Sequence, residues 1–320
     1  MGFLRSRVFW TNVGAYALAG ALVWYLSRDI PTRTIIDDVK NADMPLFVGA
    51  SLFGFAVWFI GETILFSRLF SYIHRPTGFR EVMPANAANY FMQLINLAVA
   101  GGMFVIFLNR RKGVPWLHAG WTLIFQTMID AMVLSSMIII SAIVFPNSPL
   151  GGWLWYAVGA LALFTAISAF WINGKPISKL GQWFLDRTSM EAFRTARASH
   201  YARLLSIRFV IFALSGVALY LQMSAFGIKA GFGHVMAFNP AVILLGGLPI
   251  TPVGMGPYQA VVVRGFSQFA SKSDLLAASL AITGTAIAFR IPMGLFSAGL
   301  MADEVAHPVE PETAGKDAAA

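Results

Sequence analysis

The 320-residue sequence has no cysteine, and only 12% of its residues are charged. The absence of cysteine excludes disulfides, thiolate metal sites and cysteine nucleophiles. The five histidines are far apart and form no HExxH or other metal-ligand spacing, so we expect no metal site. The sequence also has no nucleotide-binding motif, and we therefore expect no cofactor.

Apolar residues dominate the composition. Hydrophobic residues make up 57% of the chain, and the mean hydropathy is +0.67, which is more apolar than a soluble domain. The apolar runs are about 20 residues long, which favours helices over a barrel. We predict an all-α integral membrane protein with about six transmembrane helices plus two opposed re-entrant helical hairpins. The predicted spans are residues 8–27, 45–66, 116–145, 153–171, 204–226 and 275–300.

The net charge of +8 is explained by basic residues in cytoplasmic loops rather than by nucleic acid, and we expect no nucleic-acid partner. Fourteen of the 23 basic residues fall in segments that we assign to the cytoplasm: Arg5, Arg7, Arg68, Arg75, Arg80, Arg110, Arg111, Lys112, Lys175, Lys179, Arg187, Arg194, Arg197 and Arg203. We therefore predict a protein of the bacterial inner membrane with both termini on the cytoplasmic side. Residues 173–203 are either an interfacial amphipathic segment or a solvated loop. Residues 1–301 form one membrane domain, and the polar tail 302–320 is predicted to be disordered.

Two apolar segments contain helix breakers. Residues 85–108 have basic residues at both ends, which favours a hairpin that enters and leaves from the cytoplasm over a single crossing. Residues 238–269 hold three prolines and five glycines between positions 246 and 266, and must begin and end outside. Non-helical backbone is tolerated at membrane depth only beside protein or a watery cavity, so the breakers predict a cavity lining.

Polar residues recur within the first of these segments. Asn86, Asn89, Gln93 and Asn96 are spaced by three, four and three residues, on one helical face ahead of a break at Gly101 and Gly102. They serve either as amide contacts between helices or as a polar wall that recognises a lipid head group.

Ionisable residues inside spans are functional candidates. Asp130 lies near the middle of the third span, one turn after Gln126, and Glu62 lies near the cytoplasmic end of the second. The alternatives are a structural ion pair, a proton relay or a head-group contact. The available partners are Arg208, Arg264 and Arg290.

The sequence "LPITPVGMGPYQAVVV" resembles the Pro-Ile-Ser-Pro-Gly-Gly-Leu-Gly-Val-Arg-Glu-Ala signature of the lysylphosphatidylglycerol synthase transmembrane family, whose members are flippase-like. The matching positions are Pro249, Ile250, Thr251 in place of Ser, Pro252, Gly254, Gly256 and Ala260. Residues 101–134, with Asp130, and residues 286–296, with Arg290, are also similar to the family. The resemblance extends over residues 45–300 and implies a membrane protein that handles lipids.

The sequence departs from the family in both hairpins. Tyr258 and Gln259 stand where relatives usually have Arg-Glu, and residues 97–100 are uncharged where relatives often have charges. If those charges contact head groups in relatives, the cargo here has a neutral or weakly polar head, such as a hopanoid-like lipid.

The leading hypothesis is an inner-membrane lipid transporter or flippase without catalytic residues, with the lipid as substrate and a lipid-synthesising or transport protein as a possible partner. Glu62 and Asp130 are the candidates for proton or ion coupling. The alternative is an intramembrane transferase, in which Asp29, Asp37 and Asp38 bind a divalent ion; as a third possibility, the basic loop 175–203 docks a lipid-modifying enzyme. The predicted translocation residues are Asn89, Gln93, Asn96, Gly101, Gly102, Gln126, Asp130, Pro249, Thr251, Pro252, Gly254, Gly256, Tyr258, Gln259, Arg264 and Arg290.

Overall fold

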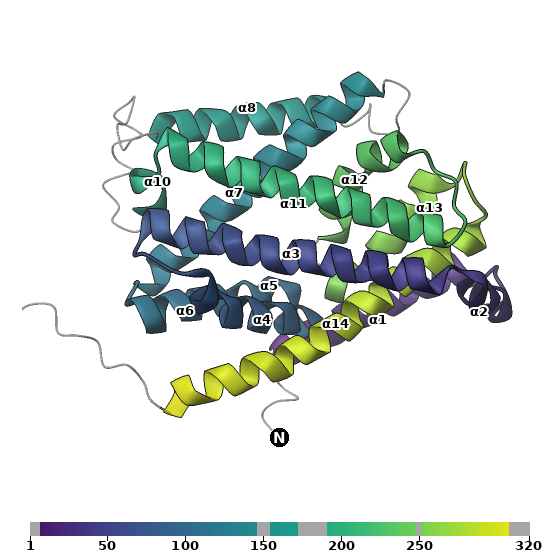
Figure 1. Ribbon diagram of the computed structural model, residues 1–320, viewed down its shortest axis with the longest axis horizontal. Helices are drawn as coiled ribbons and strands as arrows, with labels where there is room; N and C mark the ends of the chain where they lie inside the picture. Colours follow the sequence, from purple (N-terminus) through teal and green to yellow (C-terminus); the bar gives the residue numbers. More distant parts are fainter. Residues whose placement is uncertain (1–6, 146–153, 172–190, 248–250, 307–320) are drawn as a thin grey trace, which may run out of the picture.

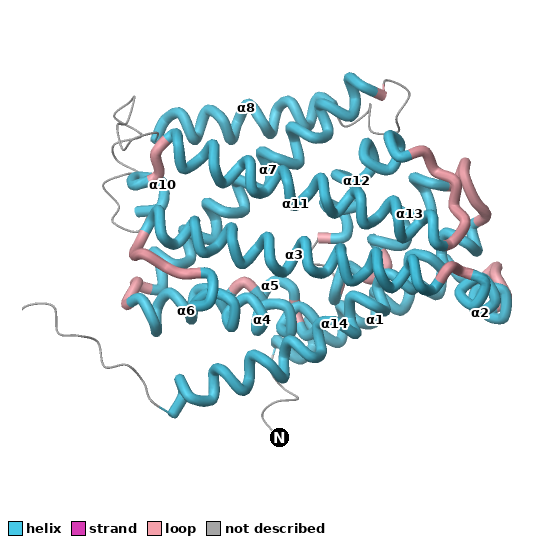
Figure 2. Tube along the Cα trace, viewed as in Figure 1, coloured by secondary structure: helices cyan, strands magenta, loops and turns pink. Residues whose placement is uncertain are grey.

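A computed structural model of the chain describes residues 7–145, 154–171, 191–247 and 251–306. Every regular element in these ranges is a helix, as Figure 2 shows. The long helices lie side by side and form a bundle (Figure 1). The predicted all-helical membrane fold is therefore confirmed at this level.

The helices follow one another with short connections over most of the described chain. Their bounds, in chain order, are α1 (Arg7–Ser27), α2 (Thr32–Asn41), α3 (Met44–Ile73), α4 (Phe79–Ile95), α5 (Leu97–Ala100), α6 (Gly102–Lys112), α7 (Trp116–Val144), α8 (Leu154–Trp171), α10 (Glu191–Thr195), α11 (Ala198–Ala225), α12 (Phe232–Gly246), the 3₁₀ helix η5 (Pro252–Gly254), α13 (Pro257–Phe266) and α14 (Lys272–Ala306).

Among the described residues, four helices are long and apolar enough to cross a membrane: α3, α7, α11 and the part of α14 up to Ser297. They correspond to the second, third, fifth and sixth predicted spans. Shorter apolar helices, Tyr16–Ser27 and Trp155–Ala166, lie where the first and fourth spans are predicted. The total of six spans therefore stays a prediction.

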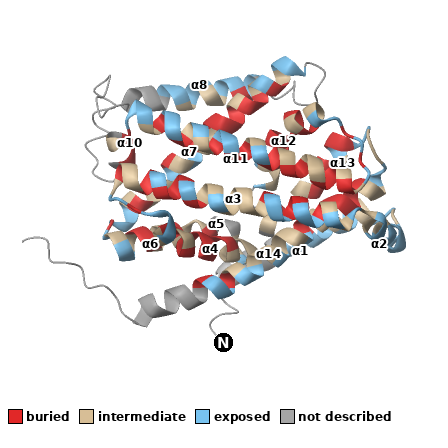
Figure 3. Ribbon diagram, in the orientation of Figure 1, coloured by how far each residue is buried: buried red, intermediate tan, exposed pale blue. Residues whose placement is uncertain are grey.

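The outer surface of the bundle is apolar. Trp155 on α8 and Leu295 on α14 are 79% and 76% exposed, and α8 shows little buried surface in Figure 3. The interior is filled by aromatic rings, among them Phe66 and Phe104, whose centroids are 3.8 Å apart. Large exposed apolar side chains over a packed core are expected where the surrounding solvent is lipid.

The first broken segment consists of α4, α5 and α6. We predicted its break at Gly101 and Gly102, but α4 already ends before Asn96, whose backbone is extended (φ −159°, ψ 117°). The Asn96 side chain accepts a hydrogen bond from the Val99 amide at 3.2 Å, an interaction that competes with the helix. A second interruption follows at Gly101.

The two arms of this segment run back alongside each other. Helices α4 and α6 are in contact, and their outer ends lie at the end of the bundle where α3 ends and α7 begins (Figure 1). Lys112 at the end of α6 donates to Glu81 at the start of α4 at 2.6 Å. Glu81 also accepts from the Gly78 amide at 2.9 Å, which caps α4.

The second broken segment consists of α12, η5 and α13. Helices α12 and α13 are in contact, and the backbone between them turns through positive φ angles at Val253 (55°), Gly254 (69°) and Gly256 (95°). A Cβ atom at Gly254 would overlap the carbonyl group of Gly246, so this close approach requires glycine. The glycine content therefore reflects the geometry of the turn.

The two broken segments enter the bundle from opposite ends in Figure 1, and η5 contacts α4 in the interior. At the chain end, α14 continues to Ala306, past the start of the predicted tail; residues 307–320 lie outside the described residues. Most of the segment 173–203 also lies outside them, apart from α10 and the start of α11.

Candidate functional site

A cavity of about 670 Å³ lies in the centre of the bundle. Side chains from α3, α4, α6, α7, α11, α12, α13 and α14 line it, together with Gly101, Gly247 and η5. The first broken segment contributes Asn89 and Gln93, and the second contributes Val253 and Tyr258. The volume is within the range of small-molecule and cofactor sites.

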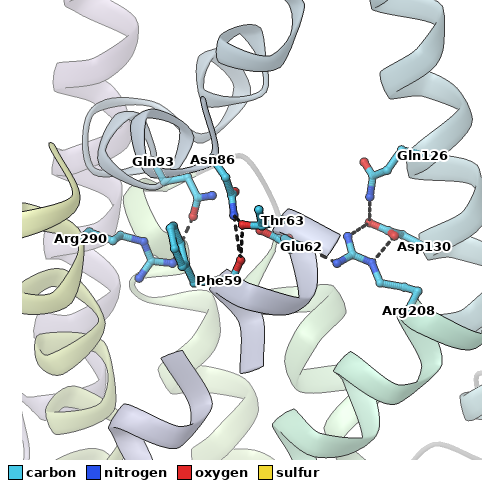
Figure 4. A network of polar contacts seen from close by, with 9 residues as sticks. All are labelled: Phe59, Glu62, Thr63, Asn86, Gln93, Gln126, Asp130, Arg208 and Arg290. Atoms are coloured by element: carbon cyan, nitrogen blue, oxygen red, sulfur yellow. Dashed lines mark hydrogen bonds and ion pairs between the residues drawn. The ribbon is translucent and has the colours of Figure 1, made fainter. Parts of the chain in front are cut away.

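Arg208 on α11 is the centre of the first charged group in this cavity (Figure 4). Only 3% of this residue is exposed. Its Nε and Nη2 groups donate to the two carboxylate oxygens of Asp130 on α7, and Nη1 lies 3.3 Å from Oε1 of Glu62 on α3. Gln126, one turn before Asp130, donates to the same carboxylate at 2.6 Å. The cluster thus ties three long helices together.

The guanidinium of Arg208 also contacts two aromatic rings. Its Cζ atom is 5.0 Å from the ring centroid of Phe212 and 5.6 Å from that of Trp58. Two carboxylates and one guanidinium give the cluster a formal charge of −1. A buried charge of this kind is tolerated when it is paired and hydrogen-bonded, as it is here.

Arg290 on α14 forms a second charged group, next to the end of α4. It donates to the Ala286 carbonyl at 3.0 Å and to Oε1 of Gln93 at 3.1 Å, and it lies 5.4 Å from the ring centroid of Tyr90. Its Nε atom is buried without a hydrogen-bond partner among the described residues. Arg290 adds a charge of +1, so the formal charges of the two groups sum to zero.

The predicted face of amides is divided between two roles. Asn86 is fully buried and donates to the carbonyl of Phe59 at 3.0 Å and to the hydroxyl of Thr63 at 2.9 Å, so it joins α4 to α3. Asn89 and Gln93 line the cavity. Contact between helices is therefore confirmed for Asn86, whereas recognition of a head group by Asn89 and Gln93 stays a prediction.

Among the residues predicted in the second broken segment, Tyr258 lies in the cavity lining. Gln259 instead accepts from the Gly256 amide at 2.6 Å and donates to Thr283 at 2.9 Å, so it fixes the start of α13. Pro249 lies outside the described residues. The Pro252 side chain is likewise outside the description. The remaining predicted residues absent from the lining are Asn96, Gly102, Thr251, Gly254, Gly256, Gln259 and Arg264.

Several lining residues were missed by sequence reasoning. Asn239 on α12 donates to the Phe212 carbonyl at 2.8 Å, and Gln222 on α11 donates to Ser51 at 3.1 Å. Neither residue belongs to a periodic row of amides like the one on α4, so the sequence gives no spacing signal for them. Arg208 was named only as a possible ion-pair partner.

The aspartates near α2 make contacts with the start of α14. Asp29 lies 3.7 Å from Lys272, and Asp38 accepts a hydrogen bond from Ser273. Within the described ranges, no group of three histidine or carboxylate side chains is arranged to hold a metal ion. These contacts hold α2 against α14.

Comparison with known proteins gives one match to a family. The model of the family described as "Lysylphosphatidylglycerol synthase TM region" matches residues 12–294. No curated protein matches the chain.

Proposed function

Because this chain belongs to the lysylphosphatidylglycerol synthase TM region family, we propose that it is a transporter or flippase that moves an amphipathic lipid across the bacterial inner membrane. The observation that carries the proposal is the central cavity, to which both broken segments contribute polar side chains. Discontinuous helices that meet near the midplane form substrate sites in secondary transporters.

In the proposed topology, the two broken segments are re-entrant hairpins from opposite leaflets. Each returns to the end of the bundle from which it starts, which supports this arrangement (Figure 1). The basic residues beside α4 and α6 assign the first hairpin to the cytoplasmic side, and the same charge rule places both chain termini there.

The proposed cargo has a neutral or weakly charged head group, such as that of a hopanoid-like lipid. Glu62 and Asp130 are balanced by Arg208 and Arg290, so a strongly charged head would leave a net charge in the cavity. The Nε–H of Arg290, which has no partner in the described part of the chain, offers a hydrogen bond to a hydroxyl or carbonyl oxygen of the cargo.

The carboxylates around Arg208 provide a means of coupling transport to protons. Protonation of Asp130 or Glu62 would weaken one arm of the ion cluster that joins α3, α7 and α11. The relative positions of these helices would then depend on the proton, as in other proton-coupled transporters.

Transport is tested in phosphatidylcholine vesicles that contain the purified chain and a lipid labelled with a fluorophore on its head group. A membrane-impermeant quencher reports the fraction of lipid that changes leaflet. We expect movement of a lipid with a neutral head, and its loss in Arg290→Gln. The matched control is Arg264→Gln, because Arg264 is exposed on α13 and absent from the cavity lining. Equal rates in the two variants would contradict the proposal.

The transferase alternative requires the acidic residues near α2 to bind an ion. Because Asp29 and Asp38 make contacts with α14, transport is the better supported function. Loss of function with intact folding in the Asp37→Asn/Asp38→Asn variant would favour the enzyme. Docking of a lipid-synthesising protein on the basic loop 175–203 is a separate proposal, tested by pull-down with charge-deleted variants.

A further inference from the structure

An open groove on the surface, of about 520 Å³, lies between α3 and α11 away from the central cavity. We name it the arginine groove. Its lining consists of Arg68 and Tyr72 from α3 and of Ala202, Arg203, Ser206 and Ile207 from α11. Nothing in the proposed transport cycle uses these residues.

The arginine groove results from small residues on α11. Ala202 and Ser206 are four positions apart, so they lie one above the other on the same face of the helix. Both are exposed, and the Ser206 hydroxyl donates to the Ala202 carbonyl at 2.8 Å. The longer side chains of Arg68 and Arg203 also line the groove.

The arginine groove carries two positive charges that are exposed to a ligand. Arg68 and Arg203 are exposed, and neither forms an ion pair among the described residues. Within the described part of the chain, no carboxylate lines the groove. Tyr72 stacks on His200, with ring centroids 4.3 Å apart, so the ring is held at the groove.

The surface changes from basic to apolar along the same two helices. Arg68 lies five residues before the end of α3, and Arg203 five residues after the start of α11, about 8 Å from the helix ends. Further into the bundle, Ile64, one turn from Arg68 on α3, and Val210, two turns from Arg203 on α11, are exposed apolar side chains. Charge near the end and apolar surface beyond it match the head and the chains of a phospholipid.

We propose that the arginine groove binds the phosphate of an anionic phospholipid in the cytoplasmic leaflet, with its acyl chains along Ile64 and Val210. Guanidinium groups recognise phosphate through paired hydrogen bonds, and basic pockets between transmembrane helices bind anionic head groups. The Tyr72 hydroxyl provides a further donor at the same place. This site does not depend on the cargo of the central cavity.

The test titrates the full chain in neutral detergent with phosphatidylglycerol, and separately with phosphatidylcholine, and counts bound lipids by native mass spectrometry. We expect the wild type to bind phosphatidylglycerol more tightly than phosphatidylcholine. The double variant Arg68→Gln/Arg203→Gln should bind it about 25-fold more weakly, since each arginine near an anionic surface contributes roughly fivefold. Ala202→Leu should also weaken binding because it fills the groove without changing charge.

The matched control is Arg110→Gln/Arg111→Gln, which removes two exposed charges at the same end of the bundle but on α6. We expect this variant to bind phosphatidylglycerol as the wild type does. Equally weakened phosphatidylglycerol binding in both double variants would overturn the site, because the loss would then depend on the overall charge of the protein and not on the groove. Displacement of phosphatidylglycerol by inorganic phosphate would overturn the lipid assignment.

Discussion

Replacement of Arg208 by glutamine should be the most destabilising single change in the cavity. The substitution removes the guanidinium that donates to both oxygens of Asp130 and lies 3.3 Å from Glu62. Two carboxylates would then be left in the interior without a counter-charge. Gln126 would remain as the hydrogen-bond donor to Asp130, but an amide cannot neutralise the charge.

The expected magnitude follows from the burial of the arginine. Removal of one partner from a buried ion pair typically lowers the free energy of unfolding by about 3–5 kcal/mol. Arg208 serves two carboxylates, but both line the cavity and the Asp130 side chain is 23% exposed, so we expect a loss near the lower end, about 3 kcal/mol. Asp130→Asn should be milder, since it leaves Arg208 paired with Glu62.

The assay is reversible unfolding of the purified chain in mixed micelles, followed by tryptophan fluorescence. A double variant, Asp130→Asn/Arg208→Gln, closes a thermodynamic cycle. Its loss should fall short of the sum of the single losses by about 0.5–3 kcal/mol, because the residues are in direct contact. Additive losses, or a stable Arg208→Gln variant, would refute the assignment of this cluster as a structural and electrostatic centre.

Three further predictions concern transport, the turn of the second broken segment and the Lys112–Glu81 ion pair of the first. Asp130→Asn should slow lipid movement more than Glu62→Gln, because Asp130 accepts two of the guanidinium hydrogen bonds; wild-type rates in both variants would remove protonation from the mechanism. Gly254→Ala should lower the free energy of unfolding by about 1–3 kcal/mol, since its φ is 69°, and an unchanged denaturation midpoint would contradict this. The hydrogen bond from Lys112 holds the pKa of Glu81 below its usual value. The ionised carboxylate therefore stabilises the fold at pH values above the pKa that Glu81 has in the unfolded chain. This stabilisation is lost as the pH falls through the pKa of the folded state. Glu81→Gln should therefore have a lower melting temperature than the wild type at neutral pH, and the difference should vanish in acid. A difference independent of pH would contradict a stabilising role of the Lys112–Glu81 ion pair.

Much of the helical architecture is predictable from the sequence because it depends on local patterns. Long apolar runs predict α3, α7, α11 and α14, and the closely spaced glycines and prolines predict the turn after α12. The pairing of Gln126 with Asp130 also follows from their spacing of four residues.

Other features depend on packing between distant segments. Asp130 and Arg208 are 78 positions apart, and only the arrangement of α7 against α11 brings them together. The same holds for Arg290 and Gln93, which are 197 positions apart. Asn96 stands between α4 and α5 with an extended backbone, and its side chain accepts from the Val99 amide in α5, a local effect that the more obvious glycines concealed.

The most direct test of the central claim, a watery cavity shared by the two broken segments, uses single cysteines in this cysteine-free chain. Thr127 and Thr285 line the cavity, whereas Ile140 and Leu295 are exposed on the apolar outside of α7 and α14. With the protein in vesicles, a membrane-impermeant thiol reagent should modify cysteines at the two threonine positions quickly and those at the other two slowly. Fast reaction only at positions 140 and 295 would contradict the account.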